Sequence, residues 1–341
     1  MEDKKLDKQV AGISAVAHYV PQLIRTSEDV EKLINAHLKP EIQTGSIERL
    51  SGIITRHISR EDEYNSTLAI GACRILFEKE KINPSDIDLL IFASTGQDIL
   101  EPATAHIVQA EIGTHCRVMD IKNACNGFID AFDVAVSLIE TGRHKKVLIA
   151  TGEVPSKAAK FEVPDRDLLQ QYLVGHTFGD CGTAVLITEK PKIATVIDSF
   201  FFSDSSNWDV AMFPGGGSRF LNQRDAYFFR GDATALMEPF FVHTKRLLED
   251  FLKRNNISLS NIDHIFVHQV AEFVLDRICN DLQIPKAKIQ VTIKEYGNVA
   301  AASLPLALDL RLKSQIIFSG TYGLFIGFAG GFSIGFTLVK F

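Results

Sequence analysis

The chain has 341 residues, which corresponds to roughly two or three units of ordinary domain size. Its composition is 46% hydrophobic and 23% charged, which is typical of a globular protein with a large core. The formal net charge of −6 argues against non-specific binding to nucleic acid, and no stretch reaches the roughly 18 apolar residues of a membrane span.

The N-terminus and the cysteines both favour a cytoplasmic protein. Residues 1–5 (MEDKK) are charged and lack the apolar segment of a secretory signal. The five cysteines are scattered, with no CxxC pair and no spacing typical of a metal site; they are Cys73, Cys116, Cys125, Cys181 and Cys279. We therefore expect free thiols in a reducing compartment and no metal site.

The chain contains an internal duplication. Residues 76–88 match residues 251–263 without a gap. Each segment predicts the end of a helix, a turn and then an apolar strand, which would be residues 89–94 in the first copy and 264–268 in the second.

The correspondence continues in the same order along both copies. A predicted strand at 147–151 matches one at 316–320, and a glycine-rich segment at 178–188 matches one at 328–338. Strands alternate with helices throughout, which indicates α/β layers with mainly parallel sheets.

Cys125 lies between a predicted buried strand, which ends near residue 121, and a predicted helix at residues 127–140. Apolar residues recur at helical spacing through that helix, which ends before Gly142. Backbone N–H groups and the helix dipole at such a junction favour a thiolate, which is the nucleophile of acyl transfer. The alternative is a cysteine that only fills space in the core.

The two halves, residues 1–190 and 191–341, each contribute polar groups at equivalent places. The first half carries Cys125. In the second half His268 ends the matching strand, and Asn298 precedes the helix that corresponds to the one after Cys125. Since duplicated halves tend to pack about a pseudo-twofold axis, we expect the three side chains to meet where the halves join.

Five motifs resemble those of the thiolase-like condensing enzymes, most closely ketoacyl synthase III. They are NACNGF (123–128), FGDCG (178–182), VHQ (267–269), YGNVAAASLP (296–305) and GFAGG (327–331). Each motif alone is a weak signal, but all five occur in the family's order over nearly the whole chain.

The resemblance implies an α/β fold of the thiolase type, with five layers (α-β-α-β-α) made of the two duplicated halves, and a homodimer. It implies no cofactor, and thioesters of coenzyme A or acyl carrier protein as substrates. Cys125 would accept an acyl group, and the backbone N–H groups of Cys125 and Gly330 would form an oxyanion hole. His268 and Asn298 would donate hydrogen bonds to the second thioester during a Claisen condensation.

Recognition of the carrier differs from the family pattern. The family's arginine that helps to dock acyl carrier protein is replaced by Phe273, and its adenine-stacking tryptophan has no counterpart near residues 45–50. Arg49 and Arg56 are candidates for contact with phosphates of the carrier, with a solvated surface role as the alternative.

Glu101 occupies the region of the family's dimer loop, where the ordinary enzyme has an aromatic residue. A carboxylate there resembles the head-to-head acyl-condensing enzymes of olefin, pyrone and dialkylresorcinol synthesis, in which a glutamate of the neighbouring subunit acts as a base. A second substrate that loses no CO₂ needs such a base at its α-carbon. The alternative is a solvent-facing loop residue.

The sequence thus favours a ketosynthase that joins two acyl or β-ketoacyl thioesters through acyl-Cys125, with Glu101 of the partner subunit as base. A decarboxylative synthase III that uses a malonyl thioester, in fatty acid or polyketide synthesis, is the second reading. Transfer of the acyl group to an alcohol or amine is the third. An inactive partner subunit is disfavoured by the intact set of Cys125, His268 and Asn298.

Overall fold

The computed structural model describes residues 10–221 and 223–341. The charged segment at residues 1–5 lies outside these described residues. Among the described residues no helix has both the length and the apolar content to cross a bilayer.

Five strands of the first half lie side by side in the order β1-β7-β6-β4-β5. They are β1 (Gly12–Tyr19), β4 (Leu89–Ala93), β5 (Arg117–Ile121), β6 (Lys146–Glu153) and β7 (Cys181–Thr188). β4 is parallel to both β5 and β6, whereas β7 is antiparallel to β6 and to β1.

Four strands of the second half continue in the order β11-β12-β13-β8. They are β8 (Ala194–Ser203), β11 (His264–Val267), β12 (Tyr322–Ala329) and β13 (Ser333–Lys340). β11 and β12 are parallel, and the other neighbours are antiparallel. The sheets are therefore mixed, and the prediction of mainly parallel sheets is wrong.

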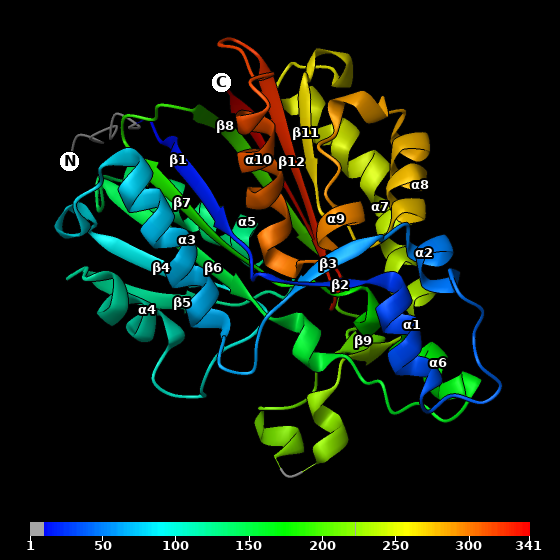
Figure 1. The fold of residues 1–341 in the computed structure, drawn as a ribbon. Helices are drawn as coiled ribbons and strands as arrows, with labels where there is room; N and C mark the ends of the chain where they lie inside the picture. The colour runs from blue at the N-terminus through cyan, green and yellow to red at the C-terminus, as the bar shows by residue number, and fades with distance from the viewer. Residues whose placement is uncertain (1–9, 222) are drawn as a thin grey trace.

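The two groups of strands form one nine-stranded sheet, but the connection between them is narrow. β1 pairs with β8 only through Gly12 with Thr195 and Ile13 with Ala194. Beyond these two pairs the sheets diverge, and helices fill the space between them (Figure 1).

The central layer consists of α5 (Gly127–Glu140) and α10 (Ser303–Lys313). These helices pack with residues of both sheets into one apolar core, which includes Ile91 of β4 and Phe325 of β12. Successive strand residues point to opposite faces, so Leu90 and Phe92 of β4 belong to a different core on the other side of the sheet.

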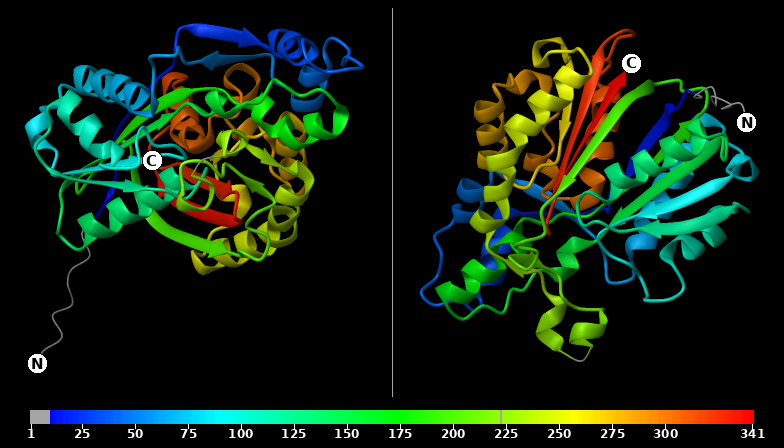
Figure 2. Two further views of the ribbon diagram at one scale, coloured as in Figure 1. Left: turned by 90° about the horizontal axis from the view of Figure 1, so that it is seen from below. Right: turned by 180° about the vertical axis from the view of Figure 1, so that it is seen from behind.

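Two pairs of helices form the outer layers. α3 (Asn65–Glu80) and α4 (Thr104–Ile112) cover the first sheet, and α7 (Ala233–Arg254) and α8 (Glu272–Leu282) cover the second. Figure 1 and the rear view in Figure 2 show this α-β-α-β-α order, which agrees with the expected fold class.

The remaining elements are short and lie outside the layers. They are α1 (Ser27–Asn35), α2 (Ser46–Ser51), α6 (Arg166–Tyr172), α9 (Ile293–Tyr296), β2 (Leu23–Thr26), β3 (Thr55–Ile58), β9 (Ala211–Met212) and β10 (Arg230–Gly231). α1, α2 and α6 share a small apolar core of their own.

The predicted helix after Cys125 is confirmed at residues 127–140, because its apolar spacing matches a helix packed in the central layer. Two predicted strands differ from the structure. β5 is the edge strand of the sheet and is partly exposed rather than buried. Residues 316–320 form an irregular segment and a turn with Ile316 and Phe318 exposed, because the strand begins only at Tyr322, which pairs with Lys340 of β13.

Candidate active site

Cys125 lies in a tight turn between β5 and α5, as the sequence predicts. The N–H of Asn126 donates to the carbonyl of Asn123 at 3.0 Å, and the N–H of Gly127 donates to the carbonyl of Ala124 at 3.0 Å. Ala124 has φ +44°, an uncommon value for a residue with a side chain. The turn therefore holds the nucleophile candidate in a constrained position at the start of the helix.

The acidity of the Cys125 thiol differs from the prediction. Part of the residue remains exposed, yet the protein atoms around the thiol raise its pKa to about 12, first by desolvation and then through the nearby Glu153 carboxylate. Burial and Glu153 thus oppose the thiolate that the start of the helix was expected to favour.

The turn around Cys125 packs directly against the second half. The side-chain amide of Asn126 donates to Ser333 Oγ at 2.9 Å, and that of Asn123 donates to the same oxygen at 3.3 Å. A Cβ at Gly327 would lie 2.5 Å from Asn126 Oδ1, so the two segments touch without room for a side chain. Gly330, the expected second oxyanion donor, lies in the turn between Gly327 and Ser333.

His268 follows β11 and is 1% exposed. Its N–H donates to the carbonyl of Ile326 at 3.0 Å, and its ring lies 4.9 Å from the ring of Phe328, centroid to centroid. Burial lowers the pKa of His268 to about 3, so the ring is neutral at physiological pH. Neither ring nitrogen has a hydrogen-bond partner, which is expensive in a core and typical of a site that awaits a ligand.

Asn298 is buried beside the FGDCG segment. Its N–H donates to the carbonyl of Thr177 at 2.9 Å, and its carbonyl accepts from the N–H of Gly179 at 3.1 Å. The side-chain oxygen accepts from the N–H of Ala300 at 3.0 Å, so the NH₂ group is the donor end of the amide. A neutral His268 and this amide are both suited to donate to a carbonyl oxygen.

Glu153, at the end of β6, is a further polar group of this region that sequence reasoning missed. The side chain is fully buried, and the N–H of Thr95 donates to it at 2.7 Å. Its only signal in the sequence is a carboxylate at the end of an apolar strand, which many solvated loop residues share.

Glu101 does not join the site of its own chain. It lies exposed in the connection between β4 and α4, and its neighbours Ile99 and Leu100 are exposed as well. The same connection is fixed nearer its start, where the N–H of Ser66 donates to Asp98 at 3.1 Å.

The two arginines proposed for carrier recognition are in different environments. Arg49 is exposed on α2 and donates to the carbonyl of Thr44 and the hydroxyl of Ser46. Arg56 has no exposed surface and donates to Ser27 Oγ at 3.1 Å. Burial contradicts the predicted phosphate contact of Arg56, because a carrier in solvent cannot reach its guanidinium.

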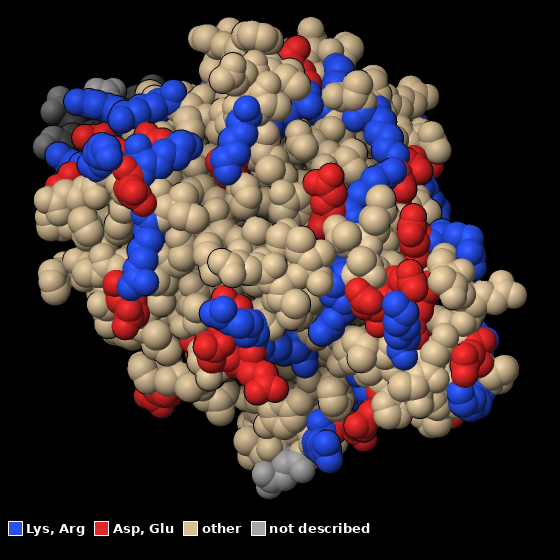
Figure 3. Space-filling model, in the orientation of Figure 1, with Lys and Arg blue, Asp and Glu red and all other residues tan. Residues whose placement is uncertain are grey.

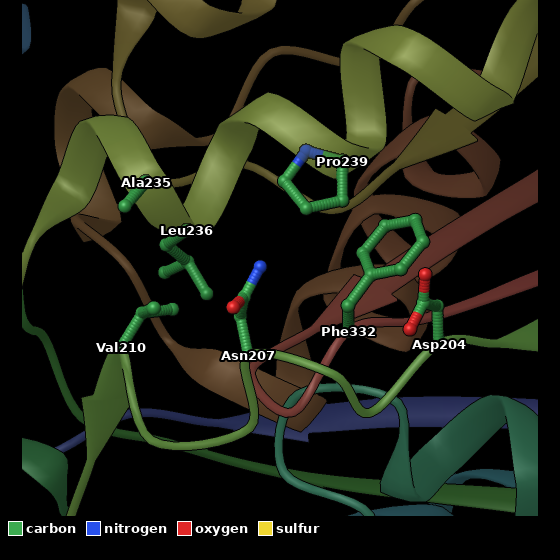
Figure 4. A pocket seen from close by; sticks show the side chains of 7 residues that line it. All are labelled: Asp204, Asn207, Val210, Ala235, Leu236, Pro239 and Phe332. Carbon is green, nitrogen blue, oxygen red and sulfur yellow. The ribbon is translucent and has the colours of Figure 1, made fainter.

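A small cavity of about 20 Å³ lies beside the turn that contains Gly330 (Figure 4). Leu236 Cδ1 lies 3.9 Å from the place of a Cβ at Gly330. The volume corresponds to about one water molecule and is too small for an acyl chain. The lining residues are Asp204, Asn207, Val210, Ala235, Leu236, Pro239 and Phe332.

Charges on the face seen in Figure 3 are mixed, with lysine, arginine, aspartate and glutamate side chains interspersed around an uncharged central area.

All five cysteines are free thiols, as expected.

Two family profiles match the chain. One, described as 3-oxoacyl-[acyl-carrier-protein (ACP)] synthase III, covers residues 119–205, and the other, the C-terminal part of the same enzyme, covers residues 252–341. The first contains Cys125, and the second contains His268, Asn298 and Gly330.

Curated relatives match over nearly their full length. Beta-ketoacyl-[acyl-carrier-protein] synthase III of Aliarcobacter butzleri is 30% identical over 344 residues, with 97% of this chain and 98% of the relative covered. The enzyme of the same name from Erythrobacter litoralis is 30% identical, with 97% and 99% covered.

Solved structures share the fold. A variant of OleA from Xanthomonas campestris has a TM-score of 0.88 at 21% identity, with 98% of this chain and 99% of that chain covered. The 3-oxoacyl-[acyl-carrier-protein] synthase III of Aquifex aeolicus has a TM-score of 0.83 at 24% identity, with 98% and 100% covered. The fold is thiolase-like, and the chain belongs to the beta-ketoacyl-[acyl-carrier-protein] synthase III family, a family of condensing ketosynthases of the acyltransferase class.

Proposed function

We propose that the protein joins two acyl or β-ketoacyl thioesters through an acyl-Cys125 intermediate, with Glu101 of the partner subunit as base. The observation that carries this proposal is the contact between the halves: the turn around Cys125 packs on the segment with Gly330, and a buried His268 with two unpartnered nitrogens follows the neighbouring strand.

In the first step Cys125 Sγ forms a bond to the carbonyl carbon of a thioester. The carrier thiol leaves with the proton that Cys125 gives up, so the charge is unchanged overall. The backbone N–H groups of Cys125 and Gly330 would stabilise the oxyanion of the tetrahedral intermediate. Deprotonation of Cys125 costs free energy because its pKa is raised, so the step should be faster at alkaline pH.

In the second step the carbonyl oxygen of another thioester accepts hydrogen bonds from His268 and the Asn298 amide. Glu101 of the partner subunit removes a proton from the α-carbon, and the resulting enolate attacks the acyl-Cys125 carbonyl. A carbon–carbon bond forms and Cys125 leaves as the thiolate. The proton that Glu101 accepted then passes through solvent to the thiolate, which restores the Glu101 carboxylate and the Cys125 thiol. His268 can donate at any pH well above its pKa of about 3 as a neutral ring, so this step does not depend on an imidazolium.

Decarboxylative condensation is the second candidate, because the curated relatives are named as beta-ketoacyl-[acyl-carrier-protein] synthase III. A malonyl thioester would then supply the enolate by loss of CO₂, with the same donors on its carbonyl oxygen. Glu101 would have no chemical role. Release of CO₂ and a strict need for a malonyl thioester would favour this candidate.

Mixed dimers test the leading proposal. Glu101→Gln should keep acyl-enzyme formation, visible by intact-protein mass spectrometry, and lose condensation by about 10²-fold or more. A mixed dimer combines a Glu101→Gln subunit with a Cys125→Ala subunit. If Glu101 acts across the interface, one of its two sites contains both an intact Cys125 and an intact Glu101. If Glu101 acts within its own subunit, neither site contains both.

Those mixed dimers should therefore regain up to half of the wild-type condensation rate. Glu111→Gln, another exposed glutamate on the adjacent helix, is the matched control and should have no effect. If Glu101→Gln condenses substrates at the wild-type rate, Glu101 is not the base. If the mixed dimers are inactive, Glu101 does not act across the interface.

A further inference from the structure

Glu153 ends β6, the strand that lies between β7 and β4. Its side chain is 0% exposed. Just before it, a Cβ at Gly152 would lie 1.8 Å from the carbonyl oxygen of Asn65, so the strand end is pressed against the start of α3. A carboxylate in such a position requires hydrogen-bond donors.

The donors come from the connection between β4 and α4. The N–H of Thr95 donates to Glu153 at 2.7 Å, and the hydroxyl of Thr95 donates to the other carboxylate oxygen. Ser94 Oγ donates to the carbonyl of Gly152 at 2.6 Å. The end of β6 therefore holds the first two residues of the connection that carries Glu101.

The second half lies near the same carboxylate. The backbone N–H of Ala301, three residues after Asn298, contributes a small lowering of the pKa of Glu153. The Asn298 segment is therefore close to the carboxylate that binds the start of the Glu101 connection.

The same carboxylate lies close to the Cys125 turn. A Cβ at Gly127 would lie 3.6 Å from the backbone nitrogen of Ser94, so the start of α5 packs on the residue next to Thr95. Glu153 disfavours ionisation of the Cys125 thiol by Coulomb repulsion.

We propose that Glu153 is a positioning residue of the site: it holds the start of the Glu101 connection beside the Cys125 turn, and its charge contributes to the pH dependence with which Cys125 reacts. The role of the connection rests on the proposed function, whereas the effect on Cys125 does not.

Among the described residues, the charge of Glu153 acts on two thiols. Its Coulomb repulsion raises the pKa of Cys125 after β5 and of Cys181 at the start of β7. Asp180 and Asp309 raise the pKa of Cys181 as well. Burial raises the pKa of Glu153 to about 7, partly offset by its hydrogen bonds. Above that pH the charged carboxylate opposes formation of the Cys125 thiolate.

The test is the pH dependence of Cys125 alkylation by iodoacetamide, followed on the Cys125 peptide by mass spectrometry, in wild type and Glu153→Gln. Glutamine keeps one acceptor oxygen and removes the charge. We expect the midpoint of alkylation to fall by about one pH unit, which is about a tenfold faster reaction at pH 8. No acyl substrate takes part, so this result is independent of the condensation chemistry.

Asp180→Asn is the matched control. Asp180 is also fully buried and accepts hydrogen bonds from Ser59 and Ser156, but it acts on Cys181 and not on Cys125. Its substitution should leave the Cys125 profile unchanged. A wild-type profile in folded Glu153→Gln would overturn the electrostatic part of the proposal.

Thr95→Val gives a second route if Glu153→Gln does not fold. Loss of the hydroxyl donor makes the charged carboxylate less favourable, so alkylation of Cys125 at pH 8 should accelerate about twofold to threefold. An unchanged rate of Cys125 alkylation in Thr95→Val would count against the effect of the Glu153 charge. In Glu153→Ala the peptide at residues 94–103 should exchange backbone hydrogens severalfold faster, and wild-type exchange there would overturn the anchoring part.

Discussion

The chain leaves the equivalent strands β4 and β11 in different ways. After β4, residues 94–103 precede α4, whereas after β11 only residues 268–271 precede α8. The long connection places Glu101 at the surface, and the short one holds His268 in the interior. In this molecule the longer connection thus exposes its polar residue to solvent, whereas the shorter one keeps its polar residue in the interior.

The largest effect should come from the proposed nucleophile, with which both connections would act. Cys125→Ala should abolish the mass shift that acyl thioesters produce on the intact protein, because no other thiol lies in the turn before α5. Cys116→Ala, a half-buried thiol before β5, is the control and should load normally. A mass shift that persists in Cys125→Ala would show that the acyl group resides elsewhere.

The short connection should matter for condensation and not for loading. His268→Ala and Asn298→Ala should each lower the condensation rate by about 10²- to 10³-fold, since each removes a donor to a developing oxyanion. Acyl-enzyme formation should persist in both. His264→Gln, a buried histidine at the other end of the same strand, should have little effect on either step. Equal loss of loading and condensation would place His268 and Asn298 in the first step instead.

The long connection should respond to loss of its own anchor. Asp98→Asn weakens the acceptor for the Ser66 N–H, so the segment leading to Glu101 should become less ordered. We expect condensation to fall about five- to tenfold with normal acyl loading. Asp86→Asn, an exposed aspartate of the first half, serves as control. Unaltered condensation by Asp98→Asn would mean that this anchor does not position Glu101.

The smallest effect concerns stability. Burial lowers the pKa of His268 to about 3, whereas an unfolded histidine titrates near 6.5. The unfolded state therefore binds more protons between these values, and the free energy of unfolding falls as the pH falls, by at most about 1.4 kcal/mol per pH unit. His268→Gln has no histidine to protonate at this position. Its free energy of unfolding in urea, relative to that of wild type, should therefore rise from pH 7 to pH 6 and to pH 5. The same stability difference at all three pH values would contradict this prediction.

The sequence predicts best what depends on local periodicity and ordered motifs. The helix at residues 127–140 has a regular apolar face, and the five motifs fix the family and the layered fold. Contacts between distant segments are less accessible. The burial of Arg56 beside Ser27 and the hydrogen bonds from Thr95 to Glu153 depend on how distant elements pack, which no short pattern encodes. The predicted strand at residues 316–320 is wrong for the same reason. Its apolar residues Ile316 and Phe318 resemble those of a strand, and only the pairing of the neighbouring strands shows that they are exposed.

The narrow joint between β1 and β8 has a consequence for how the molecule unfolds. Only two residue pairs connect the sheets there, yet the central core draws on both halves through α5, α10 and the strands on either side. Either half on its own would leave that core open to water, and the molecule should therefore unfold in one cooperative transition.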